Sequence, residues 1–343
     1  MPTEEQIRQS LNEVLVPGAM RSLVSLNLVR QINVSDKKVD ITLASAALNP
    51  DAQEWLKSKV SEGTRSLPGI EKVNVAFTEA KPKEINEVGT VVAVMSGKGG
   101  VGKSLTAGLL GIALARQGKE VGILDADITG PSIPKMFGLS GARPSGSDTG
   151  IMPVLTKMGI AVMSINLVLE HEDDAVIWRG PLIGKAIQQF WEDMLWGKLD
   201  CLMVDLPPGT ADAPLTVMQS LPVSGVIIVF SPQDLAAMVV RKAVNMARQM
   251  SVPIIGVVEN MSYFTLPDTG KRLELFGTSR GDEMAKTAGA PLLAQIPIDP
   301  KLAELCDNGE IERYSSDVFD ILSQSFTQAL PPGTSNKTDN KSR

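Results

Sequence analysis

The chain has 343 residues, about 43% of them apolar, which is enough to bury a large core and to form more than one domain. Its net charge of −6 and isoelectric point near 5.1 argue against nucleic acid and anionic membranes as partners, because both are bound through a basic face. The first residues do not resemble a signal peptide, and no apolar run reaches membrane-spanning length, so we expect a cytoplasmic protein.

Residues 1–80 predict a small α+β domain, because helical and alternating apolar patterns follow one another within a short stretch. Residues 81–88 are polar and contain a proline, which predicts a linker. Residues 331–343 are almost wholly polar and predict a disordered tail. The elements expected in the small domain are helices at Glu4–Val16 and Pro50–Gly63 and strands at Val39–Leu43 and Ile70–Phe77.

The second domain, residues 89–330, begins with an apolar strand that breaks into a glycine-rich loop and then a helix at Leu105–Ala115. The loop fills the pattern G-x-x-x-x-G-K-[ST] of a nucleotide-binding P-loop. Glycines let successive backbone N–H groups point at phosphate oxygens, the lysine neutralises phosphate charge, and the hydroxyl binds Mg²⁺. The candidate phosphate-binding residues are Gly97, Lys98, Gly99, Gly100, Val101, Gly102, Lys103 and Ser104.

Two later strands end in carboxylates. The strand at Glu120–Asp127 delivers Asp125 and Asp127, and the strand at Leu199–Asp205 ends in an aspartate followed by a proline turn. Open α/β sheets bind ligands at the carboxyl ends of their strands, so these acids are expected beside the P-loop. For Asp125, capping and loop hydrogen bonding is an equally good interpretation.

Strands and helices alternate through the rest of the chain, which predicts a doubly wound, mostly parallel α/β sheet. Two apolar segments before the middle of this domain predict a hairpin or an edge insertion. The expected strands are Gly225–Ser231, Ile254–Asn260 and Pro291–Pro297, the helices are Leu182–Leu195 and Leu235–Met250, and the hairpin segments are Met152–Leu155 and Ile160–Ile165.

The extra lysine Lys98 makes the loop K-G-G-x-G-K-S, which resembles the MinD/ParA/nitrogenase-reductase class of ATPases. Within that class the chain resembles the Mrp/ApbC-type iron–sulfur cluster carrier ATPases. The stretches that carry the likeness are Trp178-Arg179-Gly180-Pro181, Pro207-Pro208-Gly209-Thr210 and Glu259-Asn260-Met261-Ser262-Tyr263-Phe264. The N-terminal domain is similar to SufT/PaaD-like domains at Leu26-Asn27-Leu28-Val29.

The resemblance implies a homodimeric ATPase that uses ATP and Mg²⁺. In it, Lys98 would reach a phosphate across the dimer, and Asp127 would orient the attacking water while Lys103 takes up phosphate charge. Ser104 and Asp205 would hold Mg²⁺. The remaining nucleotide contacts that it implies are Gly209 at the γ-phosphate, Asn260 at the adenine edge and Asp299 in a loop beside the base.

The chain departs from the family where a C-x-x-C pair would bridge a [4Fe–4S] cluster between two chains. Leu266 and Thr269 stand at those positions, and Cys201 and Cys306 do not take up the spacing, so we find no iron–sulfur ligands and expect no stable cluster. The N-terminal domain also departs, with Val16-Pro17-Gly18-Ala19 and Ala47-Leu48-Asn49 where the family often has Asp-Pro-Glu and Cys-Pro.

Three functions remain open from the sequence. The first is an ATPase serving iron–sulfur assembly, whose partners would be apo-proteins or assembly factors. The second is a MinD/ParA-like positioning ATPase, and the third is a cluster-free scaffold that keeps only the nucleotide switch. The one histidine, His171, lies in an acidic stretch and is expected to be inert.

Overall fold

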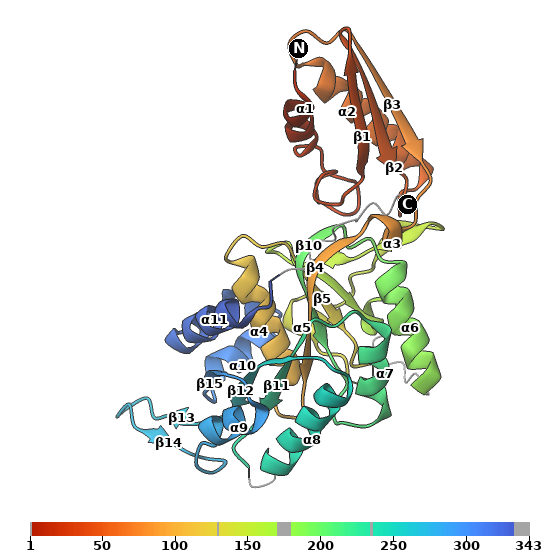
Figure 1. The fold of residues 1–343 in the computed structure, drawn as a ribbon. Coiled ribbons are helices and arrows are strands. Elements are labelled where there is room, and N and C mark those ends of the chain that lie inside the picture. Colours follow the sequence, from red (N-terminus) through yellow and green to blue (C-terminus); the bar gives the residue numbers. More distant parts are fainter. Residues whose placement is uncertain (1, 129, 170–179, 234–235, 333–343) are drawn as a thin grey trace. The chain divides into compact units, whose positions relative to one another are not determined.

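The computed structural model describes residues 2–128, 130–169, 180–233 and 236–332. The chain divides into two compact units, each built from segments that are distant in sequence (Figure 1). The smaller unit consists of Met1–Val88, Arg143–Leu155 and Gln189–Lys198, and the larger unit consists of Gly89–Ala142, Thr156–Gln188 and Leu199–Arg343.

The smaller unit contains a three-stranded sheet in the order β1-β2-β3, in which β1 and β2 are antiparallel and β2 and β3 are parallel. Two helices pack on this sheet and on each other. The Thr3 side chain caps the first helix, and Asn49 caps the second helix, which begins with Pro50. The elements are α1 (Glu4–Leu11), β1 (Val29–Ser35), β2 (Lys38–Ala44), α2 (Pro50–Arg65) and β3 (Lys72–Thr78).

The first helix is shorter than the sequence predicts. It ends at Leu11, and the residues that follow form turns, with Leu15 and Ser22 paired in an isolated bridge. The N–H of Val16 donates to the carbonyl of Arg21 at 2.8 Å, and the N–H of Leu23 donates to the carbonyl of Val14 at 3.1 Å, so these backbone groups pair across the turn and do not extend the helix. The strand β1 was not predicted from its own pattern.

Residues 81–88, which the sequence predicts to be a linker, are ordered structure. They contain α3 (Pro82–Ile85) and the start of β4 (Glu87–Met95), and Ile85 is buried in the core of the smaller unit. The side chain of Asn86 donates to the carbonyl of Met194 at 2.8 Å and accepts from the N–H of Gly197 at 2.9 Å. These side-chain contacts give a polar segment a fixed place that its composition does not indicate.

A small antiparallel hairpin completes the smaller unit, made of β6 (Ser145–Ser147) and β7 (Gly150–Met152). Met152 of this hairpin and Leu195 belong to the same apolar core as the N-terminal helices and strands. The guanidinium of Arg21 donates to the carbonyl of Trp196 at 2.7 Å. The unit is therefore assembled around residues that come from both halves of the chain.

The larger unit confirms the predicted doubly wound fold. Its main sheet has eight strands in the order β15-β12-β11-β4-β10-β5-β9-β8, and the pairs from β15 to β4 and from β10 to β9 are parallel. The segments expected to form a hairpin or an edge insertion give β8 and β9 at one edge, with β9 parallel to β5. The remaining strands are β5 (Val121–Asp125), β8 (Val154–Leu155), β9 (Ala161–Ser164), β10 (Lys198–Asp205), β11 (Gly225–Phe230), β12 (Ile254–Asn260) and β15 (Leu292–Ile296).

Helices cover this sheet, as Figure 1 shows. The helix α11 packs on α4 and β15, α8 packs on β11, and α9 packs on α8, β12 and β15. No helix in the described part of the chain is long and apolar enough to cross a membrane. The helices are α4 (Lys103–Ala115), α5 (Ile133–Met136), α6 (Gly180–Glu192), α7 (Asp212–Ser220), α8 (Ala236–Gln249), α9 (Gly281–Ala288), α10 (Pro300–Asp307) and α11 (Asp317–Ala329). Short elements are the 3₁₀ turns Ile165–Leu167 and Ile311–Arg313 and the hairpin strands β13 (Phe264–Thr265) and β14 (Arg272–Leu273).

The helix α11 offers a direct test of core packing, because Phe326 is wholly buried on it while Ile321 is 53% exposed. Replacing Phe326 with alanine should lower the free energy of unfolding by about 3–5 kcal/mol, since a cavity replaces a buried ring. Ile321→Ala should change it by less than about 0.5 kcal/mol. Urea denaturation followed by circular dichroism measures both, and similar midpoints for the two variants would contradict the packing.

Candidate nucleotide-binding site

The P-loop leaves the end of β4 and leads into α4, and two of its glycines are required by the backbone. Gly100 and Gly102 have positive φ values of 77° and 84°. A Cβ on Gly102 would overlap the side-chain amide of Asn260, and a Cβ on Gly97 would overlap Val239 of α8. The loop is therefore packed from two directions, and side chains at these glycines would push its backbone out of place.

The P-loop lysine is buried among carboxylates. Lys103 is 6% exposed, and its Nζ lies 2.6 Å from Oδ1 of Asp205 and 3.4 Å from Oδ2 of Asp127. It also lies 3.4 Å from the hydroxyl of Ser104. The structure thus brings together the lysine, the hydroxyl and both functional aspartates that the sequence singles out at the carboxyl edge of the sheet.

Asp125 and Asp205 face each other in the register of the parallel pair β5–β10, and both are wholly buried. Burial, followed by the nearby Asp205 charge, raises the pKa of Asp125 well above its ordinary value of 3.8. Burial also raises the pKa of Asp205, against the opposing effect of Lys103. Acids with raised pKa values hold more protons in the folded chain, so this pair contributes less to stability as the pH rises above about 4.

Asp125 has a structural role in this arrangement. Its carboxylate accepts hydrogen bonds from the N–H of Asp127 at 3.2 Å, the N–H of Ile133 at 3.3 Å and the hydroxyl of Ser164 at 3.1 Å. These bonds fix the segment that carries Asp127. Of the two interpretations left open by the sequence, the contacts support loop hydrogen bonding.

The donor set fits a magnesium ion. Oδ2 of Asp205 is buried and has no hydrogen-bond partner among the described residues, which leaves an acceptor that a cation would satisfy. Mg²⁺ usually binds through one or two protein oxygens together with substrate phosphates. Asp205 and Ser104 would supply such oxygens. The described residues contain no group of three or more acidic, histidine or cysteine side chains that would form an all-protein metal cage.

Two residues of the predicted phosphate site make contacts inside the unit. The ammonium group of Lys98 donates to the side-chain oxygen of Gln233, just before α8. The N–H of Gly209, expected to meet a γ-phosphate, donates to the carbonyl of Ser96 at 3.0 Å. Gly209 also has a positive φ of 91°, which explains the glycine at that turn. Sequence reasoning missed Gln233, since an isolated glutamine carries no pattern.

The predicted base contacts have other partners in the structure. The amide of Asn260 donates to the carbonyl of Val101 at 3.0 Å. Asp299 caps α10 by accepting from the N–H of Lys301 at 2.9 Å, and its other oxygen accepts from the hydroxyl of Tyr314 at 2.9 Å. Asn260 therefore lies against the P-loop and Asp299 holds a helix start. Their contacts with a base remain predictions.

The segment where the resemblance implies a C-x-x-C pair is a tight turn at the tip of the β13–β14 hairpin. The N–H of Leu266 donates to the carbonyl of Lys271, and the N–H of Gly270 donates back to the carbonyl of Leu266, both at 2.9 Å. Burial raises the pKa of the Cys201 thiol to about 12 and that of Cys306 to about 11, so neither is a ready thiolate. His171, Trp178 and Arg179 lie outside the described residues.

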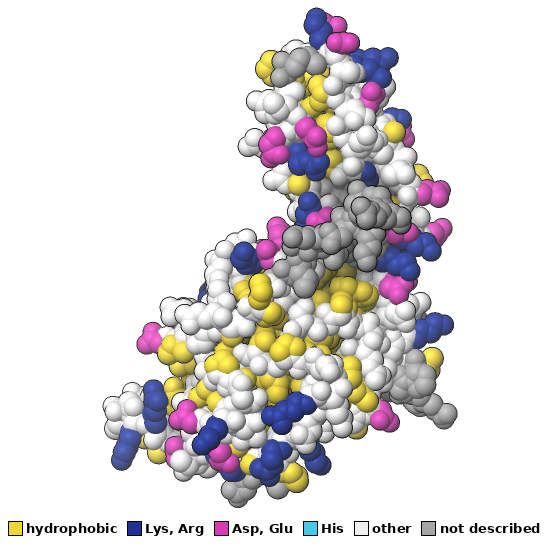
Figure 2. Space-filling model, viewed as in Figure 1, with side chains coloured by type: hydrophobic (Ala, Val, Ile, Leu, Met, Phe, Trp, Pro, Cys, Tyr) yellow, Lys and Arg dark blue, Asp and Glu magenta, His cyan; other side chains and the backbone are white. Residues whose placement is uncertain are grey.

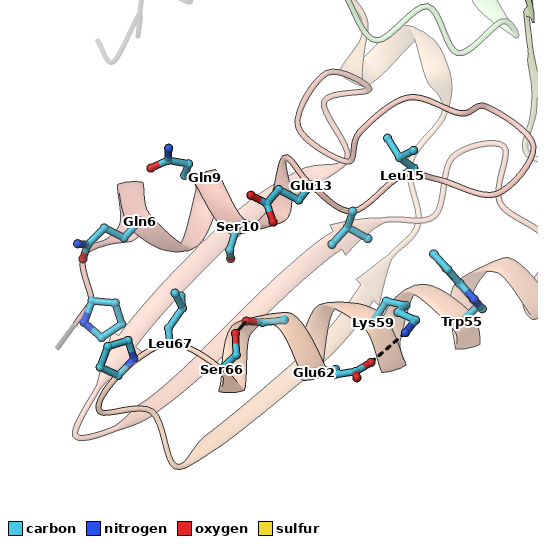
Figure 3. A pocket seen from close by; sticks show the side chains of 14 residues that line it. Gln6, Gln9, Ser10, Glu13, Leu15, Trp55, Lys59, Glu62, Ser66 and Leu67 are labelled. Atoms are coloured by element: carbon cyan, nitrogen blue, oxygen red, sulfur yellow. Dashed lines mark hydrogen bonds and ion pairs between the residues drawn. The ribbon is translucent and has the colours of Figure 1, made fainter.

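Two hollows of the smaller unit lie beside its helices. A groove of about 1060 Å³ runs between α1 and α2, with Gln6 and Gln9 on one wall and the Lys59–Glu62 ion pair on the other (Figure 3). Beside it is a pocket of about 680 Å³. Pro17, Gly18, Ala47 and Asn49, which stand at the departing motif positions, line that pocket together. The residues there are mostly apolar and do not form a metal or proton-transfer site.

Two family models match the chain. Residues 87–329 match the family described as NUBPL iron-transfer P-loop NTPase, and residues 4–77 match the family described as iron–sulfur cluster assembly protein. Among curated relatives, an "iron–sulfur cluster carrier protein" of Synechocystis is 38% identical over 321 residues, which are 90% of this chain and 91% of the relative.

Solved structures show similar folds. A nucleotide-binding protein from Archaeoglobus fulgidus in complex with ADP is 48% identical, with a TM-score of 0.62, and the match covers 68% of this chain and 91% of that chain. The MinD cell division protein of Aquifex aeolicus is 21% identical, with a TM-score of 0.51, over 71% of this chain and 98% of that chain. The second likeness concerns the fold alone.

The contact between Gly102 and Asn260 predicts that Gly102→Ala will weaken the binding of Mg²⁺·ADP by more than about tenfold, because the new Cβ displaces the loop that would hold the phosphates. Gly118→Ala is the matched control: Gly118 follows the other end of α4 with a similar φ of 77°, but its Cβ would meet nothing. The control should lose stability without losing affinity. Titration calorimetry measures the affinity of each variant for Mg²⁺·ADP. Equal affinities in the two variants would contradict the assignment.

Proposed function

Because this chain belongs to the NUBPL iron-transfer P-loop NTPase family, we propose that it binds ATP with Mg²⁺, hydrolyses it, and serves iron–sulfur cluster assembly. The observation that supports this most strongly is the position of Lys103 between Asp205 and Asp127 beneath the glycine loop. A buried lysine, an acceptor without a partner and a second acid at one sheet edge are the groups that phosphoryl transfer needs.

Each residue has a role that its environment supports. The loop N–H groups and the positive end of α4 bind the phosphates, and Lys103 neutralises the charge that develops on the transferred phosphoryl group. Bound Mg²⁺ would polarise phosphate oxygens. Asp127, which lies beside Lys103, accepts a proton from the attacking water and orients that water toward the phosphoryl group.

Nucleotide would change the partners of Lys103. Phosphate oxygens compete with Asp205 and Asp127 for the ammonium group, and a cation at Asp205 takes over the charge that Lys103 balances. The N–H of Gly209 would have to leave the carbonyl of Ser96 to reach a γ-phosphate. Nucleotide binding would therefore replace the contacts of Lys103 with the aspartates, and of Gly209 with Ser96, by contacts with phosphates.

A homodimer is part of the proposal. Lys98 follows the first glycine of the loop, and the family resemblance gives this lysine a role in the partner's nucleotide site. Reaching it would require Lys98 to release Gln233, which lies in the same unit. Gln233 thus supplies an alternative partner that would hold Lys98 until a second chain offers a phosphate.

The turn after β13 is where this chain departs from the C-x-x-C pair that the resemblance implies. A [4Fe–4S] cluster normally needs four thiolates, and the turn from Leu266 to Gly270 supplies none. The two cysteines elsewhere are held as thiols by burial. The residues present do not fit a cluster at this turn, and we propose that the protein works in cluster assembly as a nucleotide-switched factor that does not itself bridge a cluster there.

Lys103→Ala should reduce ATP turnover by at least about 100-fold, because phosphate charge in the closed site would lose its main counter-charge. Lys119→Ala is the control, since Lys119 is half exposed and forms only a long surface ion pair of 3.8 Å with Asp200. A phosphate-release assay with circular dichroism as a folding check tests this. Equal turnover in Lys103→Ala and the unmodified chain would overturn the ATPase assignment.

Anaerobic reconstitution with iron and sulfide should give no stable cluster in the unmodified chain. Leu266→Cys/Thr269→Cys should gain one, because the turn would place two thiols three residues apart at the hairpin tip. Leu273→Cys/Phe276→Cys has the same spacing on the exposed part of the hairpin and should bind much less iron. Iron and sulfide counts decide the outcome. A full cluster in the unmodified chain, lost in Cys201→Ser or Cys306→Ser, would restore the carrier assignment.

A further inference from the structure

The last two residues of β12 are a buried carboxylate and a buried amide. Glu259 is wholly buried, and Asn260 is 2% exposed. Successive side chains of a strand point to opposite faces of the sheet, so this strand end sends one polar group to each face. Nucleotide binding and hydrolysis as proposed do not use the Glu259 carboxylate or the covalent link between Glu259 and Asn260.

Asn260 holds the nucleotide loop. Its amide donates to the carbonyl of Val101 at 3.0 Å, and it fills the space that a Cβ would need on Gly102, the residue just before α4. Any movement of the loop around phosphates would therefore press on the end of β12. The contact is direct, because no other side chain lies between the amide and the loop backbone.

Glu259 holds a different segment. Its carboxylate accepts from the hydroxyls of Ser262 at 2.7 Å and Ser279 at 2.6 Å, from the N–H of Arg280 at 2.7 Å and from the side-chain amide of Gln295 at 3.1 Å. All four donors are neutral, and together they satisfy a charge that would be costly to bury without partners. Ser262 and Ser279 lie near the two ends of the segment 262–280, so the Glu259 side chain binds both ends of this segment.

The segment 262–280 carries the β13–β14 hairpin. The guanidinium of Arg272 lies over the ring of Tyr263 at 4.2 Å, and the N–H of Ser262 donates to the carbonyl of Ile296 at 3.0 Å. Beyond these anchors the hairpin is exposed, with Leu275 57% and Phe276 41% accessible. Figure 2 shows dark-blue Lys and Arg side chains at the end of the unit where Figure 1 draws this hairpin.

We propose that Glu259 is a positioning residue that ties the segment 262–280 to the nucleotide loop, so that phosphates in the loop change the order of the hairpin through Glu259 and Asn260. The inference rests on nucleotide binding at the P-loop. It adds a place where that binding is read out, on the solvent-exposed hairpin.

The strand end is suited to this role because it is rigid. Glu259 and Asn260 share a peptide unit in a strand that is buried from Ile255 to its end, and interiors packed at protein density transmit a shift and do not absorb it. Coupling between two sites is reciprocal, so whatever binds the hairpin changes nucleotide affinity by the same factor. Couplings of this kind are commonly worth about fivefold or more.

Hydrogen exchange with and without Mg²⁺·ADP tests the link on the whole chain. In the unmodified protein, nucleotide should raise the protection of both the loop 96–106 and the segment 262–280, the second by about fivefold or more. In Glu259→Gln the loop should still respond while the response of 262–280 is lost, because the new NH₂ group opposes the donors that the carboxylate accepts from.

Glu283→Gln is the matched control. It makes the same chemical change on α9, where Glu283 pairs with the side chain of Arg280 at 2.8 Å on the surface, and both responses should persist. If Glu259→Gln does not fold, Ser279→Ala removes a single donor and should reduce the hairpin response in part. An unchanged response of 262–280 in Glu259→Gln, or in Ser279→Ala where Glu259→Gln does not fold, overturns the inference. A loop 96–106 that ignores nucleotide in the unmodified chain overturns the proposed function instead.

Discussion

The buried ion pair between Lys103 and Asp205 is the interaction on which the rest of the site depends. A charge taken out of water is costly unless it is paired and hydrogen-bonded, so the two groups hold each other in place at the junction of β10 and α4. Asp127 shares the same ammonium group, and Asp125 positions the segment that carries Asp127. Loop, strand ends and acids are thereby fixed relative to one another before any ligand adds its own charges.

The parallel sheet explains why these groups meet. Strands β4, β5 and β10 come from separate parts of the sequence, but their carboxyl ends lie at one edge, and β5 and β10 end in register at Asp125 and Asp205. In β5 and β10 the four residues before the final aspartate carry no charged or hydrogen-bonding side chain other than a thiol, so the acid that ends each strand falls at the same edge. Strand order brings these residues to one edge, and the ion pair then fixes their side chains.

The residues that sequence alone identified are those whose chemistry is local. The P-loop glycines, Lys103, Ser104 and the two strand-end acids follow from short patterns, and the structure brings them together. The helix α11 was missed, although Phe319, Leu322 and Phe326 repeat at helical spacing behind a capping Ser316. Gln233 and the donors around Glu259 were missed for a different reason, because single polar residues far apart in the chain show no pattern until the fold places them together.

Residues 81–88 are a segment whose order the sequence composition did not predict. Polar composition indicated a linker, but Ile85 is buried and the Asn86 side chain pairs with backbone groups near residue 195. A linker and a tightly bound connector have similar composition. They differ in whether backbone groups elsewhere in the chain, here those of Met194 and Gly197, pair with their side chains.

The smaller unit is built from three separate segments of the chain, which matters for how the protein can be truncated. Because Met152 and Leu195 lie in the same core as the N-terminal helices and strands, and Arg21 bonds to the carbonyl of Trp196, the unit is not a detachable module. A chain that starts at residue 89 would keep Met152 and Leu195 without the N-terminal side chains that bury them.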